Sequence, residues 1–427
     1  MDTEDHIGGV LTLARSSNMR HVTTEELEAK VAAWRSIHGT PPEIRSRDQA
    51  LEYIGPELRH LDLSGMDLGK MDLRCVKLLH CNLSGASLNN ASLDGAFLFG
   101  CDLSQIDSWL GSFRGASFRQ CYIVKSRFIH GRFEGASFAH SDLENSSFLH
   151  SYHDRDTWFL EARLYRLDLR QAHLERVNLK AARTLFGVKL HLARLEGTEI
   201  DYDLFGGRIG EELDGEYVQA ARTYSAIKAN LEAAGDYAAA AKAYVKERQM
   251  EKTASAPWRA RRLHGATELG DEYEYSKELN TLVRTQLGAK WWHSRTWRFI
   301  FKHTTKWLGD WILELLCSYG ESVWRVLFWM GAMLFVLGPA LIIMLGGLRW
   351  TGENQQIFPT FPSSFQRSAY VYFQYVLYTL DTFTTAAFAQ LEPANDFVRL
   401  ASGFMALLGI FLAGLLGFVG GNRIRHS

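Results

Sequence analysis

The stretch LDLSGMDLGKMDLRCVKLLHCNLSGASLNNASLDGAFLFGCDLS, residues 61–104, decides the fold because an apolar residue returns at every fifth position. A period of five matches neither the 3.6-residue turn of an α-helix nor the two-residue alternation of a β-strand. Each group of five residues must therefore end in a corner. Internal repeats of this kind indicate a solenoid, in which each repeat contacts only its neighbours.

The same phase continues well beyond the quoted stretch. The central apolar residues are Leu63, Leu68, Leu73, Leu78, Leu83, Leu88, Leu93, Leu98, Leu103, Phe113, Phe118, Ile123, Phe128, Phe133, Phe138, Leu143 and Phe148. Ser108 is the exception within this run. Small residues such as Ala86 and Ala116 lie two positions before the centre. We expect both positions of each repeat to point into the interior.

This A(D/N)Lxx pattern resembles the pentapeptide-repeat family over residues 61–200. The resemblance implies a right-handed quadrilateral parallel β-helix over residues 57–200, with residues twenty apart stacked at about 4.8 Å. Cys81, Cys101 and Cys121 then share one column as reduced core residues, with a disulfide or metal role as the alternative. Some members of the family mimic DNA with an acidic surface. The outward positions here mix both charge signs, so we expect no nucleic-acid function.

The five-residue register breaks at residues 151–164 and resumes one residue late at Leu164. An insertion loop explains the break most simply. His153, Asp154 and Asp156 are the alternative, as ligands of a metal ion, although their spacing fits no strong metal-site template.

Composition excludes several classes of function. The 427 residues carry a formal net charge of −1, which is not typical of a nucleic-acid binder. No CxxC, HExxH, P-loop or GxSxG pattern occurs, so we expect neither an enzyme nor a cofactor. In the N-terminal segment, residues 1–56, the stretch from Met1 to about Lys30 lacks the features of a signal peptide, which predicts a cytoplasmic N-terminus. In this segment, TTEELEAKVAAW predicts a helix that starts after Thr23 or Thr24.

Residues 201–309 lose the five-residue phase and have the composition of helices. The pair Gly235 and Asp236 predicts a turn between two antiparallel helices. The second helix resembles half of a tetratricopeptide hairpin, and we interpret the segment as an adaptor rather than a peptide-binding groove. Residues 289–316 combine tryptophan with arginine and lysine, which predicts a helix at the cytoplasmic lipid boundary; a core helix is the alternative.

The mean hydropathy of −0.14 hides an apolar C-terminal domain, residues 310–427. Residues 323–348 and 400–421 are each long enough to cross a bilayer. Lysine and arginine lie before the first segment and after the second, which predicts a multi-pass protein of the cell (inner) membrane with both termini cytoplasmic. The aromatic segment between them is too short to cross, so we expect a re-entrant pore helix.

The order of span, re-entrant helix, strand and span is that of a two-helix pore. The stretch TTAAFAQLEP, residues 384–393, resembles the filter of potassium channels, where TTxGYGD or TTxGFGD precedes a proline. The resemblance implies a homotetramer that conducts monovalent cations. The ion-pathway residues would be Thr384, Thr385, Ala386, Ala387, Phe388, Ala389, Gln390 and Asp381. Alanine at both filter glycine positions predicts a wider, poorly selective pore, or one that does not conduct.

Two further residues complete the predicted pore. Asp381 lies four residues before Thr385, where a carboxylate attracts cations or braces the loop. Gly409 lies midway along the second span, as a gating hinge or as a site of close helix packing. The sequence therefore predicts a cation channel whose cytoplasmic β-helix binds an unidentified protein or ligand. The alternative is a non-conducting membrane scaffold that displays four solenoids.

Overall fold

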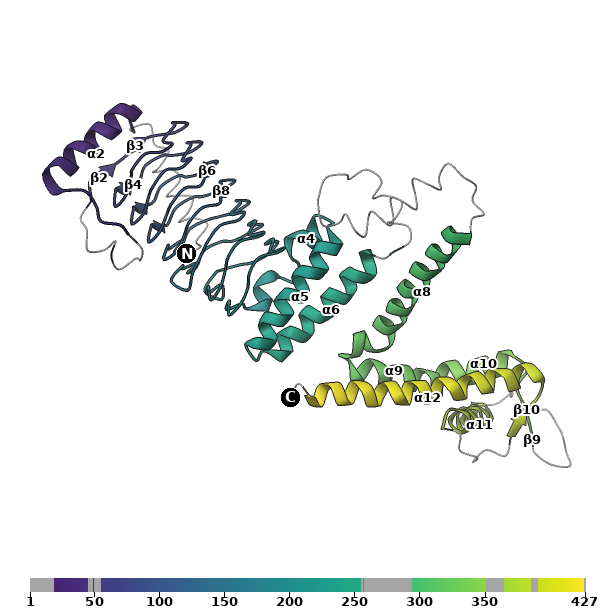
Figure 1. The fold of residues 1–427 in the computed structure, drawn as a ribbon. Coiled ribbons are helices and arrows are strands. Elements are labelled where there is room, and N and C mark those ends of the chain that lie inside the picture. The colour runs from purple at the N-terminus through teal and green to yellow at the C-terminus, as the bar shows by residue number, and fades with distance from the viewer. Residues whose placement is uncertain are drawn as a thin grey trace. The chain divides into compact units, whose positions relative to one another are not determined.

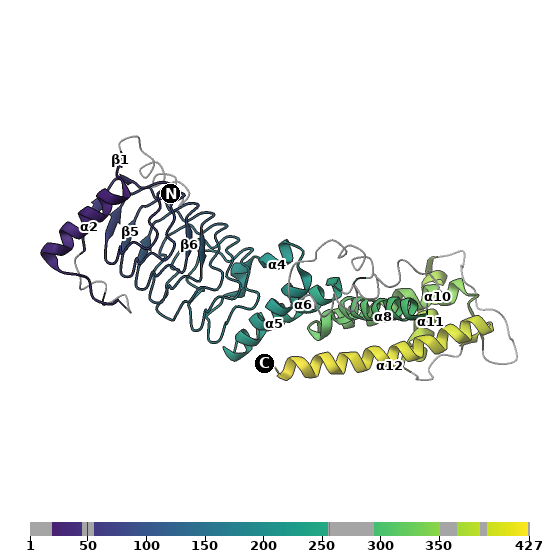
Figure 2. The same ribbon diagram turned by 45° about the horizontal axis from the view of Figure 1, so that its top comes forward.

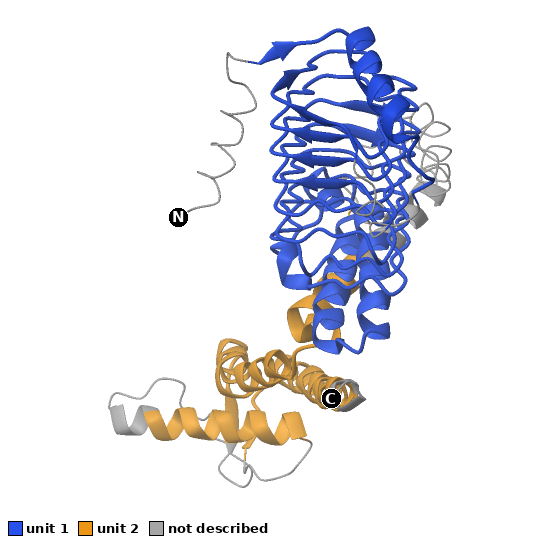
Figure 3. Cartoon of the chain, turned by 90° about the vertical axis from the view of Figure 1, so that its left-hand side faces the viewer, with its two compact units in different colours: residues 1–254 blue, residues 255–427 orange. Residues whose placement is uncertain are grey.

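A computed structural model of the chain describes residues 19–44, 49, 55–254, 256, 294–350, 365–384 and 391–425. The chain divides into two compact units, Met1–Ala254 and Ser255–Ser427 (Figure 3). The predicted β-helix and the two helices that follow it belong to the first unit. The predicted pore domain belongs to the second.

The first unit is a parallel β-solenoid, visible as a stack of similar coils in Figure 2. Its short strands are β2 (Glu57–Arg59), β3 (Leu61–Asp62), β4 (Lys77–Leu79), β5 (Phe97–Phe99), β6 (Asp107–Trp109), β7 (Ser117–Arg119) and β8 (Arg127–Ile129). The order β2-β4-β5-β7 is parallel throughout, with Leu78 opposite Leu98 and Leu98 opposite Phe118. Residues twenty apart thus lie side by side, as the sequence predicts.

Corners recur at the predicted interval of five residues. Gly65, Lys70, Cys75 and His80 all have positive φ, between 54° and 65°. This left-handed conformation turns the chain at the end of each pentapeptide, and it favours glycine because other residues have a Cβ that is crowded there. Four such turns close a coil of twenty residues.

The interior is a continuous column of apolar side chains. The leucines of the first coils give way to phenylalanines, and Phe113, Phe133, Phe138 and Phe148 are fully buried. The rings of Phe113 and Phe133 stack with centroids 4.9 Å apart. The cysteines of the predicted column are buried free thiols, and the Sγ of Cys101 donates to the carbonyl oxygen of Leu78 at 3.4 Å. They occupy the small inward position of the repeat.

The solenoid accommodates two one-residue insertions. Ser137 pairs with Trp158, twenty-one residues on, which confirms the break expected at residues 151–164. Arg163 pairs with Thr184, so a second insertion lies between residues 178 and 184. The second insertion is not evident from the sequence because the apolar positions on either side, Leu179 and Leu185, remain leucines.

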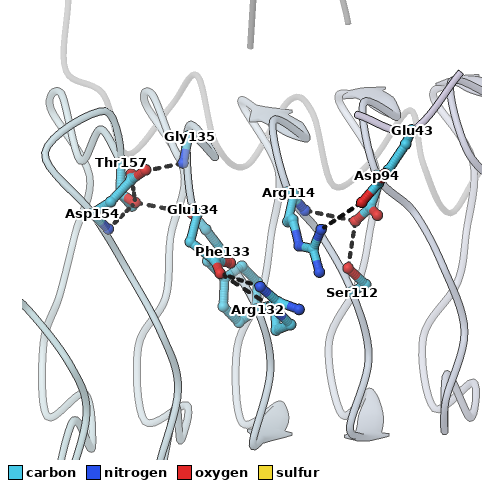
Figure 4. A network of polar contacts seen from close by, with 10 residues as sticks. All are labelled: Glu43, Asp94, Ser112, Arg114, Arg132, Phe133, Glu134, Gly135, Asp154 and Thr157. Atoms are coloured by element: carbon cyan, nitrogen blue, oxygen red, sulfur yellow. Dashed lines mark hydrogen bonds and ion pairs between the residues drawn. The ribbon is translucent and has the colours of Figure 1, made fainter. Parts of the chain in front are cut away.

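A helix and an extended segment cover the first coils. Helix α2 (Thr24–His38) begins where the Oγ1 of Thr23 accepts from the amide of Glu26, which confirms the predicted start. It follows β1 (Arg20–His21), which pairs with β3. Residues 41–44 then pass over one face, where Glu43 approaches Arg114 at 3.8 Å (Figure 4). Leu27 and Val31 of α2 belong to the same buried cluster as the apolar column, so the helix shields the open end of the column.

Helices close the other end of the solenoid. After the 3-10 turn η1 (Tyr202–Phe205) come α4 (Gly210–Leu213), α5 (Tyr217–Ala233) and α6 (Tyr237–Ala254). The antiparallel pair α5 and α6, joined at Gly235, confirms the predicted hairpin. The Oε1 atom of Glu211 accepts from the amides of Leu190 and His191 at 2.7 Å each. This carboxylate replaces the carbonyl groups that a further coil would supply.

Glu211→Ala is expected to lower the free energy of opening of the last coil by about 2 kcal/mol, because two buried amides lose their acceptor. Glu211→Gln retains the acceptor oxygen and is expected to cost less than about 1 kcal/mol. Hydrogen exchange of peptides around Leu190 in the full chain measures both values. Equal protection in the alanine variant and the unchanged chain would show that these bonds do not close the solenoid.

The second unit contains two long apolar helices. Helix α8 (Ser294–Cys317) leads through the turn η3 (Ser318–Gly320) into α9 (Val323–Ala332), the π-helical turn η4 (Met333–Leu337) and α10 (Gly338–Met344). Strand β9 (Leu348–Trp350), α11 (Phe365–Thr384), β10 (Leu391–Pro393) and α12 (Asp396–Arg425) follow. Val323–Met344 and Asp396–Gly421 are long and apolar enough to span a membrane.

Candidate functional site

The candidate site of the second unit lies where α11 meets the two apolar helices. Helix α11 lies across α10 and α12 rather than alongside them (Figure 1). Strands β9 and β10 pair antiparallel, with Leu348 opposite Pro393. The segment between the two apolar helices therefore leaves and returns at the same end of the unit. This arrangement places the C-terminal end of α11 against α12.

Specific contacts hold α11 in this position. The hydroxyl of Tyr378 lies 2.9 Å from the Oγ of Ser402 on α12, and both groups are buried. On the other side, Gly338 makes room for Thr379, since a Cβ at this glycine would lie 2.4 Å from the Cγ2 of Thr379. The hydroxyl of Tyr372 donates to the carbonyl oxygen of Phe335 in the π-helical turn.

The structure brings two of the predicted pathway residues to the end of α11. The side chain of Asp381 is buried, and the Oγ1 of Thr384 donates to the carbonyl oxygen of Leu380 at 2.7 Å. Thr385, Ala386, Ala387, Phe388, Ala389 and Gln390 lie outside the described residues. Their role in an ion pathway stays a prediction.

Gly409 lies directly against the end of α11. A Cβ at this position would lie 2.3 Å from the carbonyl oxygen of Phe383, a main-chain atom. Phe383 belongs to a buried cluster with Cys317, Val326, Leu412 and Val419. The missing side chain of Gly409 therefore permits close helix packing, one of the two roles predicted from the sequence. The hinge role stays a prediction.

Gly409→Ala is expected to destabilise the second unit by about 2 kcal/mol, because α11 and α12 must move apart. The matched control is Gly331→Ala on α9, where no described atom lies within 4 Å of the added Cβ. Alkylation of the buried Cys317 during heating of the detergent-solubilised chain measures the effect. Equal melting temperatures for the two variants would contradict the close contact.

Asn395 is a positioning residue that the sequence analysis missed. Its Oδ1 accepts from the amide of Val398 at 2.9 Å, which caps α12, and its Nδ2 donates to the carbonyl oxygen of Leu345 at 2.8 Å. One side chain thus ties the end of α10 to the start of α12. An asparagine just before an apolar helix is a recognised capping signal, but the bond to Leu345 spans fifty residues.

The residues of the alternative metal site in the solenoid, His153, Asp154 and Asp156, do not converge on one point in the structure. His153 points into the core, where its ring stacks on Phe133 at 5.3 Å. The Oδ1 of Asp154 accepts from the amide of Gly135 at 2.7 Å (Figure 4). It also accepts from the amide of Asp156 at 3.1 Å, and these bonds close the insertion. Among the residues that the structure describes, no group of three metal-ligating side chains converges. The insertion is a structural feature of the coil.

Known proteins match the first unit. The family model for pentapeptide repeats matches residues 57–89 and 72–105, in eight copies. Residues 57–105 are pentapeptide repeats. The corner positions and the twenty-residue pairing extend this pentapeptide-repeat solenoid to Glu199. No curated protein matches the chain.

Several solved structures are similar to the pentapeptide-repeat solenoid. A pentapeptide repeat protein from the Arabidopsis thaliana thylakoid lumen is 30% identical, with a TM-score of 0.20, over 20% of this chain and 61% of that one. Rfr23 from the cyanobacterium Cyanothece 51142 is 18% identical, with a TM-score of 0.17, over 34% of this chain and 87% of Rfr23. QnrB1, a plasmid-mediated fluoroquinolone resistance protein, is 15% identical, with a TM-score of 0.17, over 34% and 82%. None of these TM-scores reaches the level of a shared whole-chain fold.

Proposed function

We propose that the chain forms a homotetrameric, poorly selective cation channel in the cell (inner) membrane, regulated by its cytoplasmic pentapeptide-repeat solenoid. The observation that carries the proposal is the helix α11 between two apolar helices, flanked in the sequence by β9 and β10, which pair with each other. A segment that leaves and returns on one side fits a re-entrant pore helix. Such a helix tolerates membrane depth only where protein or water surrounds it.

The surface of α12 supports assembly of several copies. Four glycines share one side of this helix: Gly403, Gly414, Gly417 and Gly421. No described atom lies within 4 Å of a Cβ built on any of them. Each glycine costs the helix about 1 kcal/mol relative to alanine, which the contacts of a single chain do not offset. Small residues let helices approach closely in membranes, so a second copy of α12 fits here.

Four copies are proposed because one re-entrant segment would supply a quarter of a closed filter. Asp381 and Thr384 would then surround a common axis. Residues 385–390 would line the narrow part of the passage. Monovalent cations would pass there, attracted by the four carboxylates of Asp381.

The filter chemistry argues for weak selectivity. A potassium filter aims successive carbonyl groups at the ion through glycines with left-handed backbone angles. Ala387 and Ala389 occupy the glycine positions of TTAAFAQ, and each would cost roughly 1 to 2 kcal/mol in that conformation. Over four chains the cost is about 8 to 16 kcal/mol, comparable with the stability of a whole domain. We therefore propose a passage whose carbonyl oxygens do not replace the hydration shell of the ion as those of a potassium filter do.

Purified protein in planar bilayers is expected to give cation currents with reversal potentials close to zero in opposed potassium and sodium solutions. Ala387→Gly combined with Ala389→Gly is expected to shift the reversal potential toward potassium, because both backbone angles become accessible. Asp381→Asn serves as a second variant and should lower the current without changing selectivity. A strong potassium preference of the unchanged chain would refute the filter proposal.

The alanines also favour the second candidate, a membrane-anchored scaffold that displays four solenoids. In that case the pore fold would only hold the copies together. Absence of current under every voltage and pH tried, from protein that is tetrameric by mass measurement, would support the scaffold. A monomeric particle in nanodiscs would refute both candidates.

A further inference from the structure

The first of the two long apolar helices is interrupted near its middle. The π-helical turn η4 lies between α9 and α10, within the candidate span Val323–Met344. At this turn the amide of Gly338 donates to the carbonyl oxygen of Met333, five residues back instead of four. Turns of this kind are rare inside α-helices and occur frequently at functional sites.

A proline accounts for the interruption. Pro339 directly follows the turn and has no amide hydrogen, so the carbonyl oxygen of Phe335, four residues back, lacks its α-helical donor. The ring of a proline also crowds the carbonyl group four residues before it. The helix therefore opens at the carbonyl group of Phe335, near the middle of the span, where lipid provides no hydrogen-bond donor.

Tyr372 of α11 supplies a donor to this carbonyl group. Its hydroxyl forms a hydrogen bond with the carbonyl oxygen of Phe335. Seven residues on, and thus on the same face of α11, Thr379 packs against Gly338, where an added Cβ would lie 2.4 Å from the Cγ2 of Thr379. The Oγ1 of Thr379 donates within its own helix, to the carbonyl oxygen of Tyr375 at 2.8 Å, so Tyr372 makes the polar contact with the turn.

We propose that Tyr372 is the positioning residue that holds α11 against the first span, by replacing the amide that Pro339 lacks. The π-helical turn is then the hinge of this span, and α11 moves with it because both contacts lie on one face of α11. Thr384 ends α11, so a bend at the hinge shifts the start of the predicted ion passage. The inference rests on the proposed function, since it places the turn within the hydrocarbon core of the membrane.

A double-mutant cycle between Tyr372 and Pro339 tests the proposal in the full chain, reconstituted in lipid nanodiscs. Tyr372→Phe is expected to lower the melting midpoint of the second unit by about 3 to 6 °C, because a carbonyl group stays unpaired in lipid. Pro339→Ala restores a backbone donor to the carbonyl group of Phe335. Adding Tyr372→Phe to this variant should therefore change its midpoint by less than about 1 °C. Alkylation of the buried Cys317, read by mass spectrometry of its peptide, reports the midpoint.

Tyr370→Phe is the matched control for the loss of a hydroxyl. Tyr370 lies on the same helix, is 54% exposed and makes no hydrogen bond to a residue that the structure describes. Its variant should melt within about 1 °C of the unchanged chain. An equal loss from Tyr372→Phe in both backgrounds would overturn the proposal, because the hydroxyl would then not replace the missing amide. The absence of any loss in the background with Pro339 would overturn it as well.

Ion currents in planar bilayers separate this inference from the proposed function. Tyr372→Phe is expected to lower the current by at least about fivefold, and Pro339→Ala is expected to restore it in the double variant, because the position of α11 is recovered. A loss of current without this rescue would refute the positioning role. Absence of current from the unchanged chain would count against the channel, and the melting cycle would still decide whether Tyr372 completes the turn.

Discussion

Phe133→Ala is expected to lower the free energy of unfolding of the solenoid by about 3 to 5 kcal/mol. The ring of Phe133 lies at the centre of the interior column, with centroids 4.9 Å from those of Phe113 and Phe148 and 5.3 Å from that of His153. Removing it leaves a cavity between three coils. The coils cannot collapse into this space because strand pairing holds them at a constant spacing.

Two further variants serve as controls for Phe133→Ala. Phe133→Leu is expected to cost about 1 kcal/mol, since Leu93 occupies the equivalent position two coils earlier. Trp158→Ala, on the outside and 50% exposed in the unchanged chain, should cost less than about 1 kcal/mol. Urea titration of the full chain, read by alkylation of the buried Cys121, gives all three values. Equal losses for the inner and outer positions would mean that the aromatic column does not stabilise the coils.

The stability of the solenoid is expected to fall by about 3 kcal/mol between about pH 7.5 and about pH 4.5 through His153 alone. Burial among phenylalanine rings lowers the pKa of His153 to about 3, from an ordinary value of 6.5. Between these two values the unfolded chain binds a proton that the folded chain does not. Stability is therefore complete above about pH 6.5 and is lost as the pH falls.

His153→Phe isolates this contribution. Burial raises the pKa values of Asp94, Asp142 and Glu211, and these carboxyl groups act in the opposite direction as the pH falls. They are common to both proteins, so the difference between the two urea midpoints cancels them. After equilibration in urea at each pH, every sample is brought to the same pH and alkylated briefly, so that the reactivity of the cysteines reports the unfolded fraction and not the alkylation pH. A difference that stays constant with pH would show that the folded chain binds a proton at His153.

A rigid solenoid matters for the proposed function. Helices close both ends of the apolar column, and Glu211 accepts from the amides of Leu190 and His191 in the last coil. The outer faces are then free to bind partners without changes in the core.

The sequence alone predicted the features that recur with the five-residue period or depend on neighbouring residues, except the second insertion and the cap at Asn395. The five-residue period indicated the solenoid, and its phase predicted which residues lie inside. Length and hydropathy identified the two long apolar helices, while Thr23 and Gly235 marked a helix start and a turn. These features can be predicted from the sequence because each pentapeptide or helix turn packs in the same environment as the one before it, so the same residue types recur.

Tertiary structure alone decided the features that join distant parts of the chain. His153 proved to be a core residue, Gly409 a point of contact with Phe383, and Asn395 a tie between two helices. The physical reason is that these contacts depend on how separate elements pack, and no local pattern records the distance between two atoms that far apart in the chain.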